Sequence, residues 1–144
     1  MASDQYNAHH QKEPPTKHHL SHSVRTTVQS FKYASAGIKK ALKSERNFRI
    51  QLGGAVVAIA LSVLFGITAM QWVVVVLLIG LVLALELLNT ALETLVDMIT
   101  LEHDAMAERV KDVSAAAVLI FSIIACIIGA IIFIPYVWGW MQSL

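Results

Sequence analysis

The sequence has 144 residues, of which 56% are hydrophobic and only 15% are charged, and its mean hydropathy is +0.63. This composition excludes an intrinsically disordered chain, and the charged fraction is well below the about 25% of a soluble globular domain. The net charge of +1 provides no basic excess for nucleic acid, so we predict a small all-α integral membrane protein.

The N-terminal residues 1–22 are polar and have no apolar periodicity. They include Pro14, Pro15 and five histidines, His9, His10, His18, His19 and His22. We predict a disordered polar tail over 1–22, followed by a membrane-embedded domain over 23–144. Because the first residues are polar, no cleavable signal peptide is expected.

Residues 24–46 have the pattern of an amphipathic helix. Apolar residues at spacings of four, three, seven and four form one stripe, made of Val24, Val28, Phe31, Ile38 and Leu42. Basic residues lie mostly off that stripe, at Arg25, Lys32, Lys39, Lys40 and Lys43. The pattern predicts a helix on the cytoplasmic membrane surface.

Two long stretches contain no charged residue, Ile50–Leu85 and Val113–Leu144. A membrane-spanning helix needs about 20 apolar residues, and the first stretch, interrupted by Gly66, Thr68 and Gln71, is long enough for two spans and a turn. We therefore predict three spans, at about 50–66, 72–92 and 113–134. Pro135 and the interfacial aromatic residues Tyr136, Trp138 and Trp140 follow the third.

The basic residues predict the orientation in the membrane. Nine of the eleven precede residue 50, and the other two, Arg109 and Lys111, lie between the second and third spans. Because cytoplasmic loops are enriched in Lys and Arg, we expect a cytoplasmic N-terminus and 93–112 link, with the C-terminus outside.

Polar residues in the second predicted span follow a helical spacing. Glu86, Asn89, Glu93 and Asp97 have offsets of 0, 3, 7 and 11, which place them within an arc of about 80°. We call these four residues the acidic stripe. Glu86 lies about 21 Å beyond Trp72 along such a helix, still inside the hydrocarbon. Acids at that depth are candidates for a functional site.

The acidic stripe has two interpretations. Its side chains could bond neighbouring helices, as Asn89 alone often would, or they could serve chemistry on a lipid headgroup beside a water-soluble co-substrate. Glu45, just before the first span, could join Glu93 in holding Mg²⁺ against substrate phosphates. Alternatively, Glu45 could form a solvated ion pair with its neighbour Arg46.

Two motifs resemble the prokaryotic diacylglycerol kinase family. The first is Glu86-Leu-Leu-Asn-Thr-Ala-Leu-Glu-Thr-Leu-Val-Asp97, and the second is Lys111-Asp112-Val-Ser-Ala-Ala-Ala-Val-Leu-Ile120. The segments Phe31–Gly37 and Glu45–Arg49 look most like its undecaprenol kinase branch, found in Gram-positive bacteria. The resemblance extends over about residues 29–135.

The resemblance implies a kinase of the bacterial plasma membrane that transfers phosphate from ATP to a membrane lipid alcohol with Mg²⁺. It also implies a homotrimer of three-span subunits with shared active sites. Glu86 would be the general base, and Asn89 and Asp97 would orient the reacting groups. Glu45 and Glu93 would ligate the metal that bridges the ATP phosphates.

The resemblance also assigns nucleotide contacts. Lys111 and Asp112 would contact the nucleotide, with Lys111 offsetting phosphate charge, and Tyr33 would pack near the adenine. The nucleotide-binding set would then comprise Tyr33, Glu45, Glu93, Asp97, Lys111 and Asp112.

The sequence departs from the family pattern at three places. Gln51 stands where the diacylglycerol branch has an additional acid, which favours undecaprenol as the acceptor. Val110 replaces an alanine before Lys-Asp, and Thr26 replaces an early basic residue that is displaced to Arg25.

Two further alternatives remain beside a lipid kinase that acts on undecaprenol or, alternatively, diacylglycerol. The first is a helical channel subunit with the acidic stripe as its pore lining. The second is a structural oligomer packed through small residues such as Gly80 and Ala84.

Overall fold

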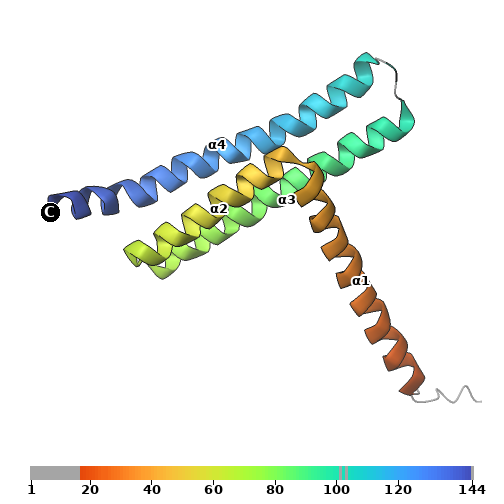
Figure 1. Cartoon of the computed structure of the whole chain (residues 1–144), viewed down its shortest axis with the longest axis horizontal. Helices are drawn as coiled ribbons and strands as arrows, with labels where there is room; N and C mark the ends of the chain where they lie inside the picture. Colours follow the sequence, from red (N-terminus) through yellow and green to blue (C-terminus); the bar gives the residue numbers. More distant parts are fainter. Residues whose placement is uncertain (1–16, 101, 103, 144) are drawn as a thin grey trace, which may run out of the picture. The chain divides into compact units, whose positions relative to one another are not determined.

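The computed structural model describes residues 17–100, 102 and 104–143, with side chains from Thr27 onward. These residues form four helices (Figure 1), namely α1 (Lys17–Ser44), α2 (Arg46–Phe65), α3 (Ala69–Ile99) and α4 (Ala105–Gln142). They divide into two compact units, residues 1–37 and 38–144, so the boundary falls within α1. The described part of the chain contains no strand, and the predicted all-α class is confirmed.

The second unit contains three helices that are long and apolar enough to cross a membrane, α2, α3 and α4. Figure 1 shows them running alongside one another, and α3 packs against both α2 and α4. Less than a quarter of each apolar segment is buried within the chain. Helices that are apolar around their whole circumference belong in lipid or in a larger assembly, so the three-span prediction is confirmed.

The helix ends differ from those predicted. The third and fourth helices extend past the predicted spans 72–92 and 113–134, to Ile99 and back to Ala105. Hydropathy locates the membrane-embedded part of a helix, whereas backbone hydrogen bonding continues until a breaker or cap intervenes. For α4 that cap is Asp104, whose side chain accepts hydrogen bonds from Met106 and Ala107.

The third predicted span stops before Pro135, whereas the helix α4 continues through this proline to Gln142. Proline removes one backbone hydrogen bond, but membrane helices tolerate it where neighbouring groups compensate. The first helix also differs, since it spans Lys17–Ser44 rather than 24–46. No glycine or proline lies between Pro15 and Gly37 to delay its start.

The predicted tail over 1–22 lies largely outside the described residues, although 17–22 belong to α1. The apolar stripe predicted for this helix is exposed where side chains are described, at Val28, Phe31, Ile38 and Leu42. An exposed apolar stripe with basic neighbours is the surface that an interfacial membrane helix presents.

The connection between α2 and α3 is a tight turn. Gly66 adopts a left-handed conformation with φ 59° and ψ 47°, which a side chain would strain. Thr68 then begins α3 with a capping box, in which its hydroxyl accepts from the Gln71 backbone N–H and its own N–H donates to the Gln71 side chain. This turn makes α2 and α3 antiparallel neighbours.

The turn end of the bundle has its own core. Ile67, Val75 and Ile132 form a buried cluster. The rings of Phe65 and Tyr136 stack with centroids 5.8 Å apart, and the Tyr136 hydroxyl donates to Gln71 Oε1 at 2.8 Å. These contacts fix α4 against α3, so the register of the two helices at the opposite end is also set.

Candidate active site

The acidic stripe passes from buried to exposed along α3. Glu86 is 2% exposed and Asn89 is 7% exposed, whereas Glu93 is half-buried and Asp97 is exposed. Measured from the first residue of α3, Glu86 lies about 26 Å along the helix and Asp97 about 42 Å. A hydrocarbon core about 30 Å thick therefore encloses Glu86 and leaves Asp97 in water.

Glu86 has a partner from α2. Gln51 Nε2 donates to Glu86 Oε2 at 2.9 Å, while Glu86 Oε1 has no hydrogen bond within the described residues. Burying a carboxylate is costly unless it is hydrogen-bonded, and one amide satisfies only one of its two oxygens. The other oxygen of Glu86 is therefore available to accept a proton.

Asn89 connects two helices. Its Nδ2 donates to Glu93 Oε1 at 2.8 Å, and its Oδ1 accepts from the Ser114 hydroxyl of α4 at 2.6 Å. The Ser114 hydroxyl also lies 2.9 Å from the Lys111 backbone carbonyl. Asn89 thus holds Glu93 in one orientation and ties it to the helix that carries Lys111.

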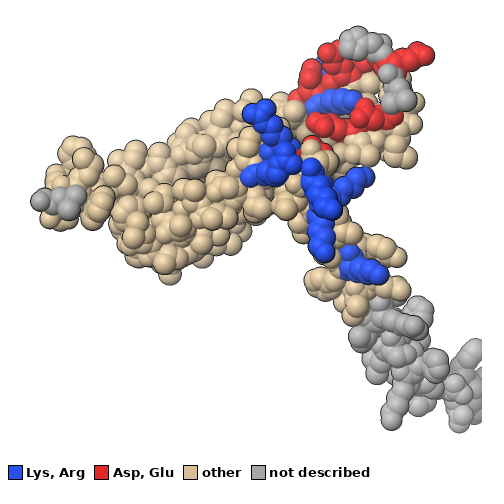
Figure 2. Space-filling model, in the orientation of Figure 1, with Lys and Arg blue, Asp and Glu red and all other residues tan. Residues whose placement is uncertain are grey.

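The exposed end of the acidic stripe carries an ion pair between α3 and α4. Lys111 Nζ contacts Asp97 Oδ1, with both side chains partly exposed. Asp112 is exposed and has no hydrogen bond or ion pair among the described residues. Figure 2 shows acidic side chains gathered where α3 ends and α4 begins. The ion pair between Lys111 and Asp97 therefore lies in a region with an excess of negative charge. Such a region attracts a cation, and a bound cation can in turn hold phosphate.

Glu45 is the single non-helical residue between α1 and α2. It occupies the N-cap position of α2, but its side chain makes no capping hydrogen bond. Its Oε1 accepts from the Ser44 hydroxyl at 2.8 Å. Arg49 donates to the carbonyl of Lys43 at 3.1 Å, which stabilises the carboxyl end of α1. The Glu45 carboxylate is thus not required for capping.

Two other carboxylates, those of Glu45 and Glu93, lie close enough to Glu86 for their negative charges to act on it. No group of three or more His, Cys, Asp or Glu among the described residues is arranged to hold a metal alone. Magnesium instead needs only one or two carboxylates when phosphate oxygens and water complete its shell. Glu45 and Glu93 each keep one oxygen without a hydrogen bond in the described part, so each has an oxygen that could coordinate a cation.

The predicted site residues do not all fall in one unit. Tyr33 is exposed and belongs to the unit formed by residues 1–37, whereas the other predicted residues belong to residues 38–144. Two residues with direct contacts to the acidic stripe, Gln51 and Ser114, were not among the predicted site residues. Gln51 is a polar residue inside an apolar helix, and this feature of the sequence could have identified it as a site residue. Ser114 stands one turn from Lys111, a spacing too common to be informative.

Comparison with known proteins agrees with this geometry. Residues 32–133 match the family model described as prokaryotic diacylglycerol kinase. The undecaprenol kinase of Bacillus subtilis is 41% identical over 107 residues, which cover 74% of this chain and 87% of the relative. The diacylglycerol kinase of Haemophilus influenzae is 37% identical over 120 residues, covering 83% and 91%. That of Escherichia coli is 30% identical over 105 residues, covering 73% and 86%.

The matched region begins within α1 and ends within α4, so it contains the whole acidic stripe with its partners from α2 and α4. Three features support the same assignment: the membrane-spanning helices, the buried Glu86 and the extent of the match. The chain belongs to the prokaryotic diacylglycerol kinase family.

Proposed function

We propose that this protein transfers the γ-phosphate of ATP to a membrane lipid alcohol, and that the alcohol is undecaprenol. The observation that carries the proposal is a buried carboxylate, Glu86, with one oxygen held by Gln51 and the other free. A base at this depth meets the hydroxyl of a lipid, whereas the more exposed Glu93 and Asp97 meet a water-soluble nucleotide.

The reaction is an in-line displacement at phosphorus. The lipid hydroxyl oxygen forms a bond to the γ-phosphorus while the bond from that phosphorus to the β–γ bridging oxygen breaks, and ADP leaves. The hydroxyl proton passes to the free oxygen of Glu86. Phosphoryl transfer depends mainly on positioning and on charge stabilisation, so the fixed orientation of Glu86 and Glu93 is the main contribution of the chain.

Glu45 and Glu93 would hold Mg²⁺, which supplies neutralisation of the phosphate charge. Asn89 keeps Glu93 Oε1 occupied, which would leave Oε2 for the cation. Asp97 orients Lys111 through their ion pair, and Lys111 adds positive charge beside the phosphates. In this proposal Asp112 contacts the nucleotide and Tyr33 packs near its adenine.

Two observations favour undecaprenol over diacylglycerol as the acceptor. A relative that is 41% identical is an undecaprenol kinase, and Gln51 stands where the diacylglycerol branch has an acid. An amide beside Glu86 donates a hydrogen bond to it, whereas an acid there would repel its charge. The alternative acceptor, diacylglycerol, is tested in the same experiment.

The proposed assembly is a homotrimer with active sites shared between subunits, in which a neighbouring chain meets the exposed Asp112. The proposed orientation keeps the basic first helix and the link between α3 and α4 in the cytoplasm, where ATP is available. A channel would need charged groups along a pore, but here Glu86 is buried and hydrogen-bonded within one chain.

The decisive experiment measures label transfer by the purified protein in detergent micelles. With γ-phosphate-labelled ATP and Mg²⁺, we expect label in undecaprenol at a kcat/KM at least tenfold above that for diacylglycerol. Equal or preferred labelling of diacylglycerol would reverse the acceptor assignment. Absence of label in both lipids would reject the lipid kinase assignment.

A further inference from the structure

A line of hydrogen bonds joins α4 to the acidic stripe. The Ser114 hydroxyl of α4 lies 2.6 Å from Asn89 Oδ1, and Asn89 Nδ2 donates to Glu93 Oε1 at 2.8 Å. Asn89 is buried, whereas Ser114 and Glu93 are half-buried. The line therefore ends at a residue that the proposed function uses and begins at one that has no assigned role.

The short contact between Ser114 and Asn89 shows where the hydroxyl hydrogen of Ser114 lies. Two oxygen atoms 2.6 Å apart need a hydrogen between them, and Asn89 Oδ1 carries none. The Ser114 hydroxyl also lies 2.9 Å from the Lys111 backbone carbonyl, a usual partner of serine in a helix, but it has only one hydrogen. The shorter contact takes that hydrogen, so Ser114 donates to the Asn89 amide.

The bond from Ser114 decides how the Asn89 amide is turned. An asparagine amide has two ends of similar shape but opposite hydrogen-bonding character. With its carbonyl end paired to Ser114, the amide presents its NH₂ end to Glu93, and both ends are satisfied. Without the hydroxyl, Asn89 Oδ1 would be a buried acceptor without its donor, a costly state that turning the side chain away would relieve. Glu93 would then lose its partner.

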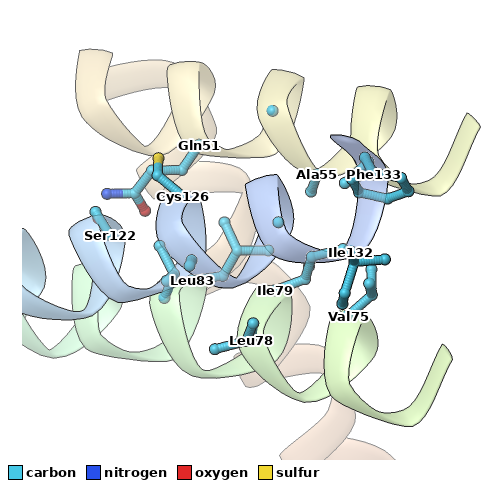
Figure 3. A pocket seen from close by; sticks show the side chains of 15 residues that line it. Gln51, Ala55, Val75, Leu78, Ile79, Leu83, Ser122, Cys126, Ile132 and Phe133 are labelled. Atoms are coloured by element: carbon cyan, nitrogen blue, oxygen red, sulfur yellow. The ribbon is translucent and has the colours of Figure 1, made fainter. Parts of the chain in front are cut away.

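The amide of Gln51, which also bonds the acidic stripe, provides a contrast. Its Nε2 donates to Glu86, but its buried Oε1 has no hydrogen-bond partner in the described residues. Figure 3 shows this amide among the residues that line an apolar groove of about 240 Å³ between α2, α3 and α4. The Gln51 amide is thus held at one end, whereas the Asn89 amide is held at both. The second bond at Asn89 is the one that Ser114 supplies.

We infer that Ser114 is a positioning residue of the active site, whose hydroxyl holds the Asn89 amide in the orientation that donates to Glu93. The inference rests on the proposed function and deepens it, because Glu93 is a proposed Mg²⁺ ligand that needs its remaining oxygen for the cation. Groups that orient a metal ligand typically change metal affinity by about 10–100-fold. Since Ser114 acts through Asn89, we expect an effect of about tenfold, the lower end of this range.

Substitutions at Ser114 separate its hydroxyl from its shape. Threonine and valine are both branched at the β-carbon, but only threonine keeps a hydroxyl. The probe is the Mn²⁺ complex of a non-hydrolysable ATP analogue, and water proton relaxation measures its binding to the full chain in micelles without catalysis. We expect Ser114→Val to weaken this binding about tenfold and Ser114→Thr to stay within about twofold of the wild type.

Two controls test whether the effect is specific. Ser62→Ala removes a fully buried hydroxyl that bonds the Ala58 carbonyl, and it should leave the affinity for the Mn²⁺ complex unchanged. In the Asn89→Ala background, Ser114→Val should cause no further loss, because the two residues act in series. In transfer assays, Ser114→Val should raise the Mg²⁺ concentration for half-maximal activity, while KM for the lipid alcohol stays at the wild-type value.

The outcomes separate the inference from the proposed function. If Ser114→Val weakens binding of the Mn²⁺ complex and Ser114→Thr does not, but the wild type labels no lipid, the positioning role stands and the kinase assignment fails. If the wild type labels lipid but Ser114→Val and Ser114→Thr bind the complex equally, the inference is overturned. Equal losses in Ser114→Val and Ser62→Ala, or no binding of the complex to the wild type, would also overturn it.

Discussion

Both ends of the bundle formed by α2, α3 and α4 carry polar side chains that bond across helices, but they use them differently. At the turn end, Tyr136 donates to Gln71, which also completes the cap of Thr68. At the opposite end, Gln51 and Ser114 hold members of the acidic stripe. The polar groups that bond at the turn end are neutral, whereas the acidic stripe carries carboxylates, of which Glu86 and Glu93 each keep an oxygen without a hydrogen bond in the described residues.

This difference separates structural polar residues from functional ones. A buried neutral pair contributes a modest stabilisation and leaves nothing for a ligand. A buried carboxylate with a free oxygen, beside an amide with a free carbonyl, is expensive to maintain. The four predictions that follow therefore expect loss of activity from changes in the acidic stripe and loss of stability from changes at the turn end.

The largest expected effect is that of Glu86→Gln. The amide retains the shape of the side chain but cannot accept the hydroxyl proton, so turnover should fall by about 10²–10⁴-fold, the usual contribution of a general base. The measurement is label transfer from ATP to lipid, with the oligomeric state checked by light scattering. The exposed Glu102→Gln is the control and should keep wild-type turnover. Activity of Glu86→Gln near that of the control would refute the base assignment.

Glu93→Gln should act on the metal requirement. Loss of one carboxylate ligand should raise the Mg²⁺ concentration for half-maximal activity by about 10–100-fold, the range typical of changes around a metal site. The experiment is a Mg²⁺ titration of the transfer rate at fixed ATP. Glu108→Gln, an exposed acid in the first turn of α4, removes the same charge away from the proposed ligands. If both variants shift the titration equally, Glu93 contributes general charge and is not a ligand.

At the turn end, Gly66→Ala should destabilise the protein without changing the site. A side chain at φ 59° costs about 1–2 kcal/mol, which should lower the midpoint of thermal unfolding. KM for ATP and for lipid should stay at wild-type values in the folded fraction. Gly80→Ala is the matched control because its helical backbone accepts a side chain with open space around it. Equal stability of the two variants would contradict the strain assigned to Gly66.

Tyr136→Phe should give the smallest effect. It removes the hydrogen bond to Gln71 but keeps the ring stacked on Phe65, so the expected loss is about 0.6 kcal/mol, the mean for such bonds in a membrane protein. Reversible unfolding in mixed micelles measures the loss. A tenfold fall in transfer activity in this variant would show that the turn end, too, takes part in the reaction.

Much of the fold was predictable because it follows from local patterns. The charge-free stretches predict three membrane helices, and the offsets of Glu86, Asn89 and Glu93 place them on one face before any packing is known. The ends of the helices were not predictable in the same way. Hydropathy predicts neither the helix cap formed by Asp104 nor the continuation of α4 past Pro135, because both depend on hydrogen bonds rather than on apolar content.

The sequence by itself therefore determined the class of protein, the number of spans and the face of α3 that carries the acids, because helical periodicity and the cost of charge in lipid are local properties. Only the tertiary structure decided which groups meet those acids. The pairing of Gln51 with Glu86, of Ser114 with Asn89, and the groove beside them depend on the rotation and register of α2 and α4 against α3. These are set by packing between helices distant in sequence, which no spacing within one helix encodes.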